Sequence, residues 1–251
     1  MIAGLDLLLP RRCVVCGRRL YVNEAYLCLY CSSDIPFTRY WKLNRNPMAD
    51  KFNALIQNRM EILWDSTADN GAALVREHYA YACALFFFGD EAGYKHILHE
   101  IKYNGNLQLG ENFGRMLGTR LKEATWAGNI DMVLPVPLHW RRRWSRGYNQ
   151  AAVIAAQVAQ VLNAPTRTDI LRRTRHTGTQ TKMSVYQKTI NMKGAFEAAL
   201  PDDAEGIRHV LIIDDVFTTG NTLLACFIAL REVFPQPVRI SVATLAFVGR
   251  A

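Results

Sequence analysis

Apolar residues along this chain occur either in short continuous runs or at intervals of three and four residues. The continuous runs predict buried strands at residues 79–88, 132–137, 166–171, 210–213 and 238–247. The spaced apolar residues predict helices at residues 52–63, 94–101, 109–126, 152–162 and 223–233. Strands that alternate with helices indicate an α/β fold built on a parallel sheet.

Length and composition are those of a globular protein. The chain has 251 residues, 50% of them hydrophobic, which suits one large domain with a smaller addition. No apolar run approaches the roughly 18 residues that a membrane helix needs. The first ten residues carry Asp6 in a short apolar run without a basic region before it. We therefore expect neither membrane insertion nor a signal peptide, and a cytoplasmic location.

Four of the six cysteines form two pairs near the N-terminus. Cys13 and Cys16 make one Cys-x2-Cys pair, and Cys28 and Cys31 make the second after eleven intervening residues. This spacing is typical of a four-cysteine zinc ribbon, in which a closed set of ligands makes the metal structural. A segment of about 35 residues cannot bury an adequate core without such a metal.

The pattern divides the chain into three parts. We expect a zinc ribbon at 1–37, a helical connector or lid at 38–78, and an α/β domain at 79–251. Cys83 and Cys226 lie in apolar runs of the last part and are expected to be core residues rather than metal ligands.

One late segment combines a strand, two carboxylates, a hydroxyl-rich turn and a helix. Its polar residues and glycine are, in order, Asp214, Asp215, Thr218, Thr219, Gly220, Asn221 and Thr222. Amides and hydroxyls at the start of a helix bind a phosphate monoester, and the glycine permits close approach of the backbone. The carboxylates would accept hydrogen bonds from vicinal hydroxyls or hold Mg²⁺. A sugar with a 5-phosphate and free 2- and 3-hydroxyls fits both halves.

Positive charge is concentrated in the middle of the chain. Residues 135–182 contain nine basic residues and one acidic residue, which accounts for the whole net charge of +8. A polyanionic partner, either a diphosphate or a nucleic acid, fits this concentration. Arg146 and Gly147 follow a predicted strand and precede a helix, at the sheet edge where Asp214 is expected. Arg146 is therefore the best-placed diphosphate ligand.

Other basic and aromatic residues of this region suit single-stranded nucleic acid, which cations and stacking rings bind together. These candidates are Arg141, Arg142, Arg143, Trp144, Arg172, Arg173 and Arg175. Residues 172–181 lack apolar anchors and are predicted to form a loop that closes over a reacting anion or contacts DNA.

The segment from Asp214 to Thr222 resembles the phosphoribosyl-pyrophosphate (PRPP) motif of type I phosphoribosyltransferases. The ordered set of motifs is similar to that of the ComF family over nearly the full chain, most weakly at 37–78. Besides the cysteine pairs and the PRPP motif, the set comprises Lys102-Tyr103-Asn104-Gly105, Pro135-Val136-Pro137-Leu138, Arg146-Gly147-Tyr148-Asn149-Gln150, Leu171-Arg172-Arg173-Thr174, Thr179-Gln180 and Asn191-Met192-Lys193-Gly194-Ala195-Phe196.

The resemblance implies a zinc ribbon joined to a type I phosphoribosyltransferase domain with a Rossmann-like sheet. It implies a link to natural transformation and the use of imported DNA, with other competence proteins as partners. Asp214 and Asp215 would hold the ribose hydroxyls of PRPP at the catalytic centre, residues 218–222 the 5-phosphate, and Arg146 with Lys102 the pyrophosphate, with Mg²⁺ as cofactor. Two functions stay open: transfer of the phosphoribosyl group to a base or amine, or binding of single-stranded DNA with PRPP as a ligand only.

Overall fold

The computed structural model describes residues 10–65, 77–89, 93–138, 146–174 and 195–249, with the backbone alone for 61–65. Within these ranges, four parallel strands form the central sheet in the order β1-β6-β5-β2. Their bounds are Ala82–Phe87 for β1, Met132–Pro135 for β2, His209–Phe217 for β5 and Arg239–Phe247 for β6. A separate antiparallel pair joins β3 (Leu171–Arg173) to β4 (Phe196–Ala198).

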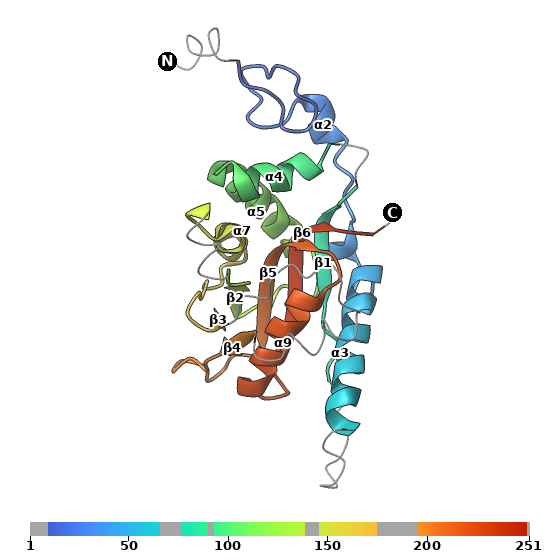
Figure 1. The fold of residues 1–251 in the computed structure, drawn as a ribbon, viewed down its shortest axis with the longest axis vertical. Helices are drawn as coiled ribbons and strands as arrows, with labels where there is room; N and C mark the ends of the chain where they lie inside the picture. The colour runs from blue at the N-terminus through green and yellow to red at the C-terminus, as the bar shows by residue number, and fades with distance from the viewer. Residues whose placement is uncertain (1–9, 66–76, 90–92, 139–145, 175–194, 250–251) are drawn as a thin grey trace.

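Helices cover both faces of the central sheet (Figure 1). The helices are α2 (Leu29–Ser33), the 3-10 helix η1 (Tyr40–Lys42), α3 (Pro47–Asp65), α4 (Lys95–Tyr103), α5 (Leu107–Lys122), α7 (Gln150–Leu162) and α9 (Asn221–Val233). α5 and α7 pack on one face of the sheet, and α9 packs on the other with α3 beside it. The predicted α/β architecture with a parallel sheet is confirmed.

The strands are buried on both faces, which explains their continuous apolar runs. All four residues of Val210–Ile213 are fully buried in β5. The predicted end of this strand at the acidic pair was wrong, because β5 continues to Phe217, which pairs with Phe247 of β6. The predicted strand at 166–171 was also wrong, because Thr166 makes only a single bridge to Val133.

The predicted loop at 172–181 begins later than expected. Arg172 and Arg173 belong to β3, where they pair with Glu197 and Phe196 of β4. This pairing is antiparallel and joins segments far apart in the chain, so local composition gave no signal for it. Residues 175–181 lie outside the described residues.

The first half of α3 is part of the main core. Its apolar side chains Met48, Ala49, Phe52 and Ile56 are buried in the same cluster as the sheet. The Phe52 ring makes edge contacts with Phe217 of β5 and Phe227 of α9. The predicted helix of the 38–78 segment is therefore present and packed, while the domain boundaries stay a prediction.

Helices α5 and α7 approach each other closely because α5 carries glycine at every fourth position facing α7. A Cβ at Gly114 would lie 3.0 Å from the Cβ of Gln157, and a Cβ at Gly118 would lie 2.9 Å from the Cβ of Val161. Gly110 continues the same stripe. This contact fixes the position of α7, whose first residue, Gln150, reaches the sheet.

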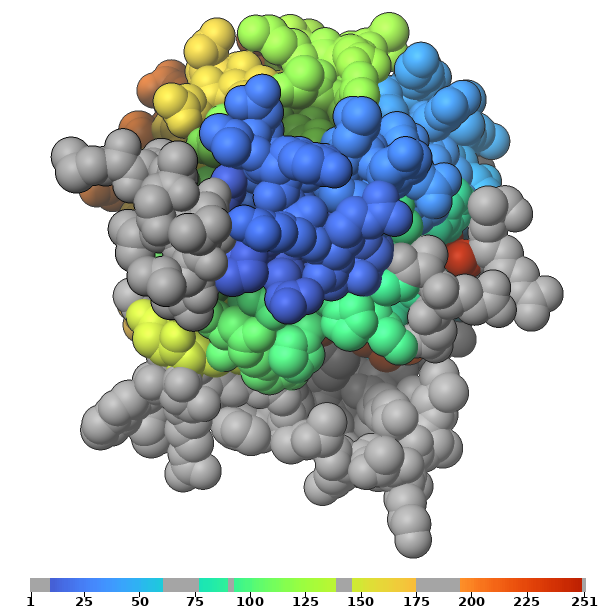
Figure 2. Space-filling view, turned by 90° about the horizontal axis from the view of Figure 1, so that it is seen from above, coloured from blue at the N-terminus to red at the C-terminus, as the bar shows by residue number. Residues whose placement is uncertain are grey.

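The cysteine-bearing N-terminal segment rests on α4 and α5. The Tyr94 hydroxyl donates to the carbonyl oxygen of Cys31 at 2.9 Å, and the Tyr26 hydroxyl donates to Oε1 of Gln108 at 3.2 Å. Figure 2 looks down onto this blue segment, which covers one end of the molecule. Among the described residues, no helix is both long and apolar enough to cross a membrane.

Candidate functional site

The four N-terminal cysteines come together as their spacing predicts. Their Sγ atoms all lie within 4.8 Å of one another, and those of Cys16 and Cys28 are 3.7 Å apart. A tetrahedral zinc ion with Zn–S bonds of about 2.3 Å separates its sulfur ligands by about 3.8 Å. The cluster can therefore hold a metal ion, and its size fits zinc.

The surroundings of the cluster act in opposite directions on two of its thiols, because burial, followed by hydrogen bonds with the other three cysteine side chains, raises the pKa of Cys31. Burial acts to raise the pKa of the Cys13 thiol, but backbone N–H groups of Cys16, Cys28 and Val15 donate to it and together lower this pKa to about 7. In the described part of the ribbon, the buried cluster consists of Cys13, Leu20 and Cys28. The ribbon thus has almost no apolar core of its own, and a metal would take that place.

The remaining cysteines are core residues, as predicted. Cys83 and Cys226 are fully buried in the main core. Burial raises the pKa of the Cys83 thiol to about 12, so this thiol stays protonated.

The two carboxylates of the PRPP motif lie near the carboxyl end of β5 in different surroundings. Asp215 is 3% exposed. Its Oδ1 lies 3.0 Å from Nζ of Lys102, and its Oδ2 accepts a hydrogen bond from Nε2 of Gln150 at 3.0 Å. Asp214 is partly exposed, and its Oδ1 accepts from the backbone N–H of Asp215 at 2.9 Å.

The surroundings of Asp214 on balance disfavour its charged form. Burial and then the charge of Asp215 raise the pKa of Asp214 to about 7, while the N–H of Asp215, Lys102 and Arg173 act in the opposite direction. Hydroxyl donors or a cation brought by a ligand would favour the ionised form of this carboxyl group.

Strand β5 leads directly into the hydroxyl-rich turn and α9. Thr218 and Thr219 are exposed, and Asn221 and Thr222 are partly exposed. Gly220 is the N-cap of α9, and no side chain caps this helix. The first amides of α9 therefore lack intrahelical partners, and the positive end of the helix dipole lies beside the exposed hydroxyls.

The backbone and the packing around Gly220 give a reason for glycine besides the predicted approach to a ligand. Its φ of +85° lies in the left-handed region, which favours glycine. A Cβ at this position would lie 2.6 Å from Cζ of Phe217 and 2.7 Å from Cδ1 of Leu55 in α3. Packing of the turn against α3 therefore requires a glycine here, whether or not the backbone also approaches a ligand.

Lys51 of α3 is a residue of this region that the sequence did not reveal. Its Nζ donates to the carbonyl oxygen of Thr218 at 2.9 Å and lies 5.6 Å from the centre of the Phe217 ring. The only sequence signal is its place next to Phe52 on a predicted helix, because the contact joins segments 167 residues apart.

The segment 146–150 joins β2 to α7 and is held by contacts with other elements. The Tyr148 hydroxyl donates to the carbonyl oxygen of Ile101 in α4. The Asn149 side chain caps α7, and its Nδ2 donates to the carbonyl oxygen of Val136 at 3.0 Å. Gly147 has a φ of +79°, so the turn that precedes α7 depends on glycine.

Arg146 lies against the last residue of α4. Its guanidinium carbon is 4.9 Å from the centre of the Tyr103 ring. Tyr103 follows Lys102, the residue that pairs with Asp215. The structure therefore places Lys102 beside the acidic pair, and Arg146 beside the residue that follows Lys102 in α4.

Two of the predicted nucleic-acid residues, Arg172 and Arg173 of β3, lie among the described residues. Arg141–Arg143, Trp144 and Arg175 lie outside the described ranges. Arg172 is exposed on β3, whereas Arg173 acts electrostatically on Asp214 and thus belongs to the surroundings of the PRPP motif.

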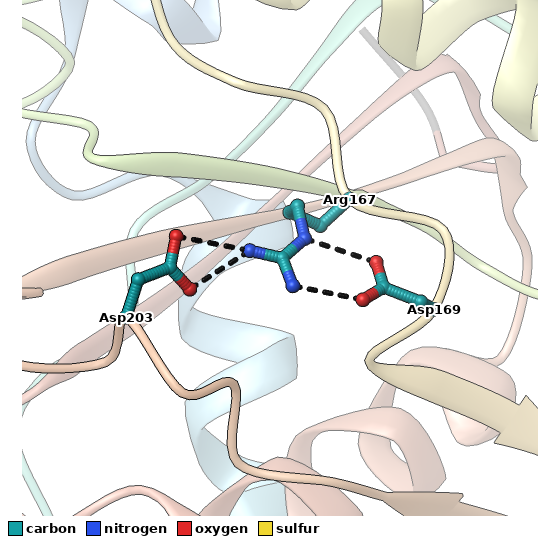
Figure 3. Close-up of polar contacts among 3 residues, drawn as sticks. All are labelled: Arg167, Asp169 and Asp203. Carbon is teal, nitrogen blue, oxygen red and sulfur yellow. Dashed lines mark hydrogen bonds and ion pairs between the residues drawn. The ribbon is translucent and has the colours of Figure 1, made fainter.

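Arg167 adds little to the free positive charge of this region. Its guanidinium group contacts Asp169 at 2.8 Å and Asp203 at 2.9 Å (Figure 3). Two carboxylates therefore neutralise a charge that the sequence count assigned to an anionic partner.

Comparison with known proteins agrees with this geometry. The family model described as "Phosphoribosyl transferase domain" matches residues 149–250, which include the acidic pair and the hydroxyl-rich turn. Competence protein F from Haemophilus influenzae is 25% identical over 235 residues, covering 91% of this chain and 94% of that protein. These two matches support the predicted resemblance to the ComF family.

Further relatives match a shorter part of this chain. DNA utilization protein YhgH from Escherichia coli (strain K12) is 32% identical over 130 residues, which are 51% of this chain and 56% of that protein. The protein of the same name from Salmonella typhimurium is 31% identical over 130 residues, with the same two shares. The parallel sheet, the matched domain and the four-cysteine cluster identify a type I phosphoribosyltransferase-like fold with an N-terminal ribbon.

Proposed function

We propose that this protein binds PRPP with Mg²⁺ and transfers its phosphoribosyl group to a base or an amine, in support of natural transformation and the use of imported DNA. One observation carries the proposal. A partly exposed carboxylate, an exposed hydroxyl-rich turn and a helix that begins at a glycine N-cap follow one another at the carboxyl edge of a parallel sheet, where α/β folds bind ligands.

Each part of this edge has a proposed task. The acidic pair, Asp214 and Asp215, serves the ribose hydroxyls of PRPP, and the turn at 218–222 binds the 5-phosphate. Lys102 and Arg146 bind the pyrophosphate. Mg²⁺ would be held by the oxygens of PRPP and the carboxylate of Asp214, since this ion commonly combines one or two carboxylates with substrate phosphates. The four cysteines hold a structural zinc ion.

The chain's contribution to transfer is positioning and charge stabilisation. Cleavage of the bond to pyrophosphate leaves positive charge on the sugar and places negative charge on the leaving group. Lys102 and Arg146 would stabilise the departing charge, and the turn would fix the sugar against the acceptor. Mg²⁺ would neutralise part of the pyrophosphate charge.

A screen of acceptors tests this proposal directly. Wild-type protein with PRPP and Mg²⁺ is incubated with each common nucleobase and with ammonia, and released pyrophosphate is measured. We expect one acceptor to accelerate release above the rate with PRPP alone. Release that is the same with every acceptor, in a protein that binds PRPP, would contradict transfer to this set of acceptors.

A second function is single-stranded DNA binding with PRPP as a ligand only. The ribbon exposes Tyr21 and Tyr30, with 77% and 70% of their surfaces accessible, and Arg18 lies 4.9 Å from the Tyr30 ring centre. Exposed rings beside cations are the groups that bind unpaired bases. The names of the relatives, which refer to competence and DNA utilization, favour such a role, in which other competence proteins would be partners.

Salt dependence separates this second function from transfer. Binding to a labelled oligonucleotide should weaken steeply as salt rises, because phosphate contacts release counterions. Absence of binding at low salt would exclude it. We place either function in the cytoplasm, because cysteines that serve as metal ligands are typical of reducing compartments.

A further inference from the structure

The two adjacent carboxylates of the PRPP motif face different neighbours. Successive side chains of a strand point to opposite faces of the sheet. Asp215 points toward α4 and α7, where it meets Lys102 and Gln150. Asp214 interacts electrostatically with Arg173 of β3 and Cys226 of α9 and also with Lys102, but only Asp215 makes a direct contact with Lys102, at 3.0 Å.

Asp215 has little surface left for a ligand. It is 3% exposed, and each of its two oxygens already has a partner at 3.0 Å. Gln150, the second partner, is itself 4% exposed. A sugar hydroxyl from solvent can therefore reach Asp214, which is partly exposed, but not Asp215 without displacing a buried contact.

Lys102 gains a fixed position from this contact. It occupies the last turn of α4, and its side chain is 20% exposed beside the almost buried carboxylate. An ammonium group has three donors, so donors remain for an anion after the contact with Asp215. The next residue, Tyr103, lies under the guanidinium group of Arg146.

We propose that Asp214 and Asp215 have separate tasks. Asp214 contacts the ribose, while Asp215 is a positioning residue that, with Gln150, holds Lys102 and the end of α4 where the pyrophosphate binds. This inference rests on the proposed PRPP site. It deepens that site by dividing the acidic pair: Asp214 alone keeps the ribose hydroxyls, and the task proposed above for Asp215 is revised to the leaving-group side.

Two ligands separate the two tasks. Ribose 5-phosphate carries the phosphate and the hydroxyls, whereas PRPP adds the pyrophosphate. Calorimetry with Mg²⁺ would compare both ligands on the wild type, Asp214→Asn, Asp215→Asn and Lys102→Met. Asp203→Asn, which removes an exposed ion pair with Arg167, is the matched control and should leave both affinities unchanged.

We expect the variants to change the affinities for the two ligands by different amounts. Asp214→Asn should weaken both ligands at least tenfold. Asp215→Asn should keep ribose 5-phosphate affinity within about threefold but weaken PRPP at least tenfold, as should Lys102→Met. In the double variant Asp215→Asn with Lys102→Met, PRPP affinity should equal that of Lys102→Met alone, because the carboxylate acts through the lysine.

The double variant is also needed in case Asp215→Asn alone does not fold. Asp215→Asn leaves a partly buried ammonium group without its partner, whereas the double variant removes both charges and should recover thermal stability without recovering PRPP affinity. Loss of ribose 5-phosphate binding in this double variant, or additive losses of PRPP affinity, would overturn the inference. If the wild type bound neither ribose 5-phosphate nor PRPP, the proposed function would be refuted, and the inference with it.

Discussion

Single residues of the PRPP motif are constrained by neighbours that are distant in the chain. Gly220 contacts Leu55 of α3, and Asp215 contacts Lys102 of α4. The sequence identified the motif through its residue types and their order. It could not divide the tasks of the two carboxylates, because that division depends on which helix packs on which face of β5.

Replacement of Gly220 should be costly. Gly220→Ala puts a Cβ into the left-handed region and within 2.7 Å of two side chains. We expect the strained backbone to reduce the free energy of unfolding by about 1–3 kcal/mol. A further reduction should follow because the new Cβ displaces the Phe217 ring. Urea denaturation measures both. Gly206→Ala, at φ +90° with open space around it, shows the backbone effect alone, so equal losses in the two variants would refute the packing argument.

Asp214 and His209 should give opposite responses to acid. The pKa of Asp214 is about 7, above its usual 3.8, so the folded state gains stability as the pH falls from about 7 to 4. Burial, followed by the charge of Arg239, lowers the pKa of His209 from 6.5 to about 4, so the folded state loses stability over nearly the same range. Each group changes the free energy of unfolding by about 1.4 kcal/mol per pH unit. Because the two changes have opposite signs, they offset each other in the wild type.

Two variants separate these responses. Between pH 6.5 and 4.5, Asp214→Asn should lose stability on acidification, because the histidine effect remains alone. His209→Gln should gain stability over the same range. Urea denaturation at three pH values measures both slopes, and variants whose slopes match that of the wild type would exclude these two groups as the source.

At the scale of elements, strands and helices were predictable because burial repeats along each of them. The pair β3 and β4 was not predictable, since each has three residues and each gains its partner from far along the chain. The stripe of Gly110, Gly114 and Gly118 was a sequence signal for close helix packing, at a spacing that places small residues on one face of α5.

Alanine at these glycines tests the packing of α5 on α7. Alanine inside a helix normally stabilises it by about 1 kcal/mol relative to glycine. We expect Gly114→Ala and Gly118→Ala to destabilise the fold instead, by about 1–3 kcal/mol, because the added Cβ overpacks the contact. Gly110→Ala, with its nearest neighbour at 3.3 Å, should have the smallest effect. Thermal and urea denaturation measure the order of stability among the three variants. A gain in stability from alanine at positions 114 and 118 would contradict the close contact between α5 and α7.

Loss of the metal should unfold the ribbon and spare the sheet. The ribbon's buried cluster is separate from the main core, so Cys13→Ser or a chelator should remove zinc and expose residues 10–34 to protease while the core stays resistant. Elemental analysis and limited proteolysis measure the two effects. Cys83→Ala is the control and should keep its zinc, whereas full zinc content in Cys13→Ser would refute the four-cysteine site.

At the scale of the whole molecule, one edge of the sheet collects groups from five elements. β5, α9, α4, α3 and the segment before α7 supply the acidic pair, the turn, Lys102, Lys51 and Arg146. The sequence placed the PRPP motif and Arg146 on this edge from strand order alone. Lys51 was missed, because its approach depends on how α3 packs against α9 and β1.

Calorimetric titration of PRPP and Mg²⁺ into the wild type and into the double variant Asp214→Asn with Asp215→Asn tests the PRPP site most directly. The account predicts binding to the wild type and none to the double variant, while circular dichroism shows that the fold persists. Equal PRPP affinity in the two proteins would contradict it.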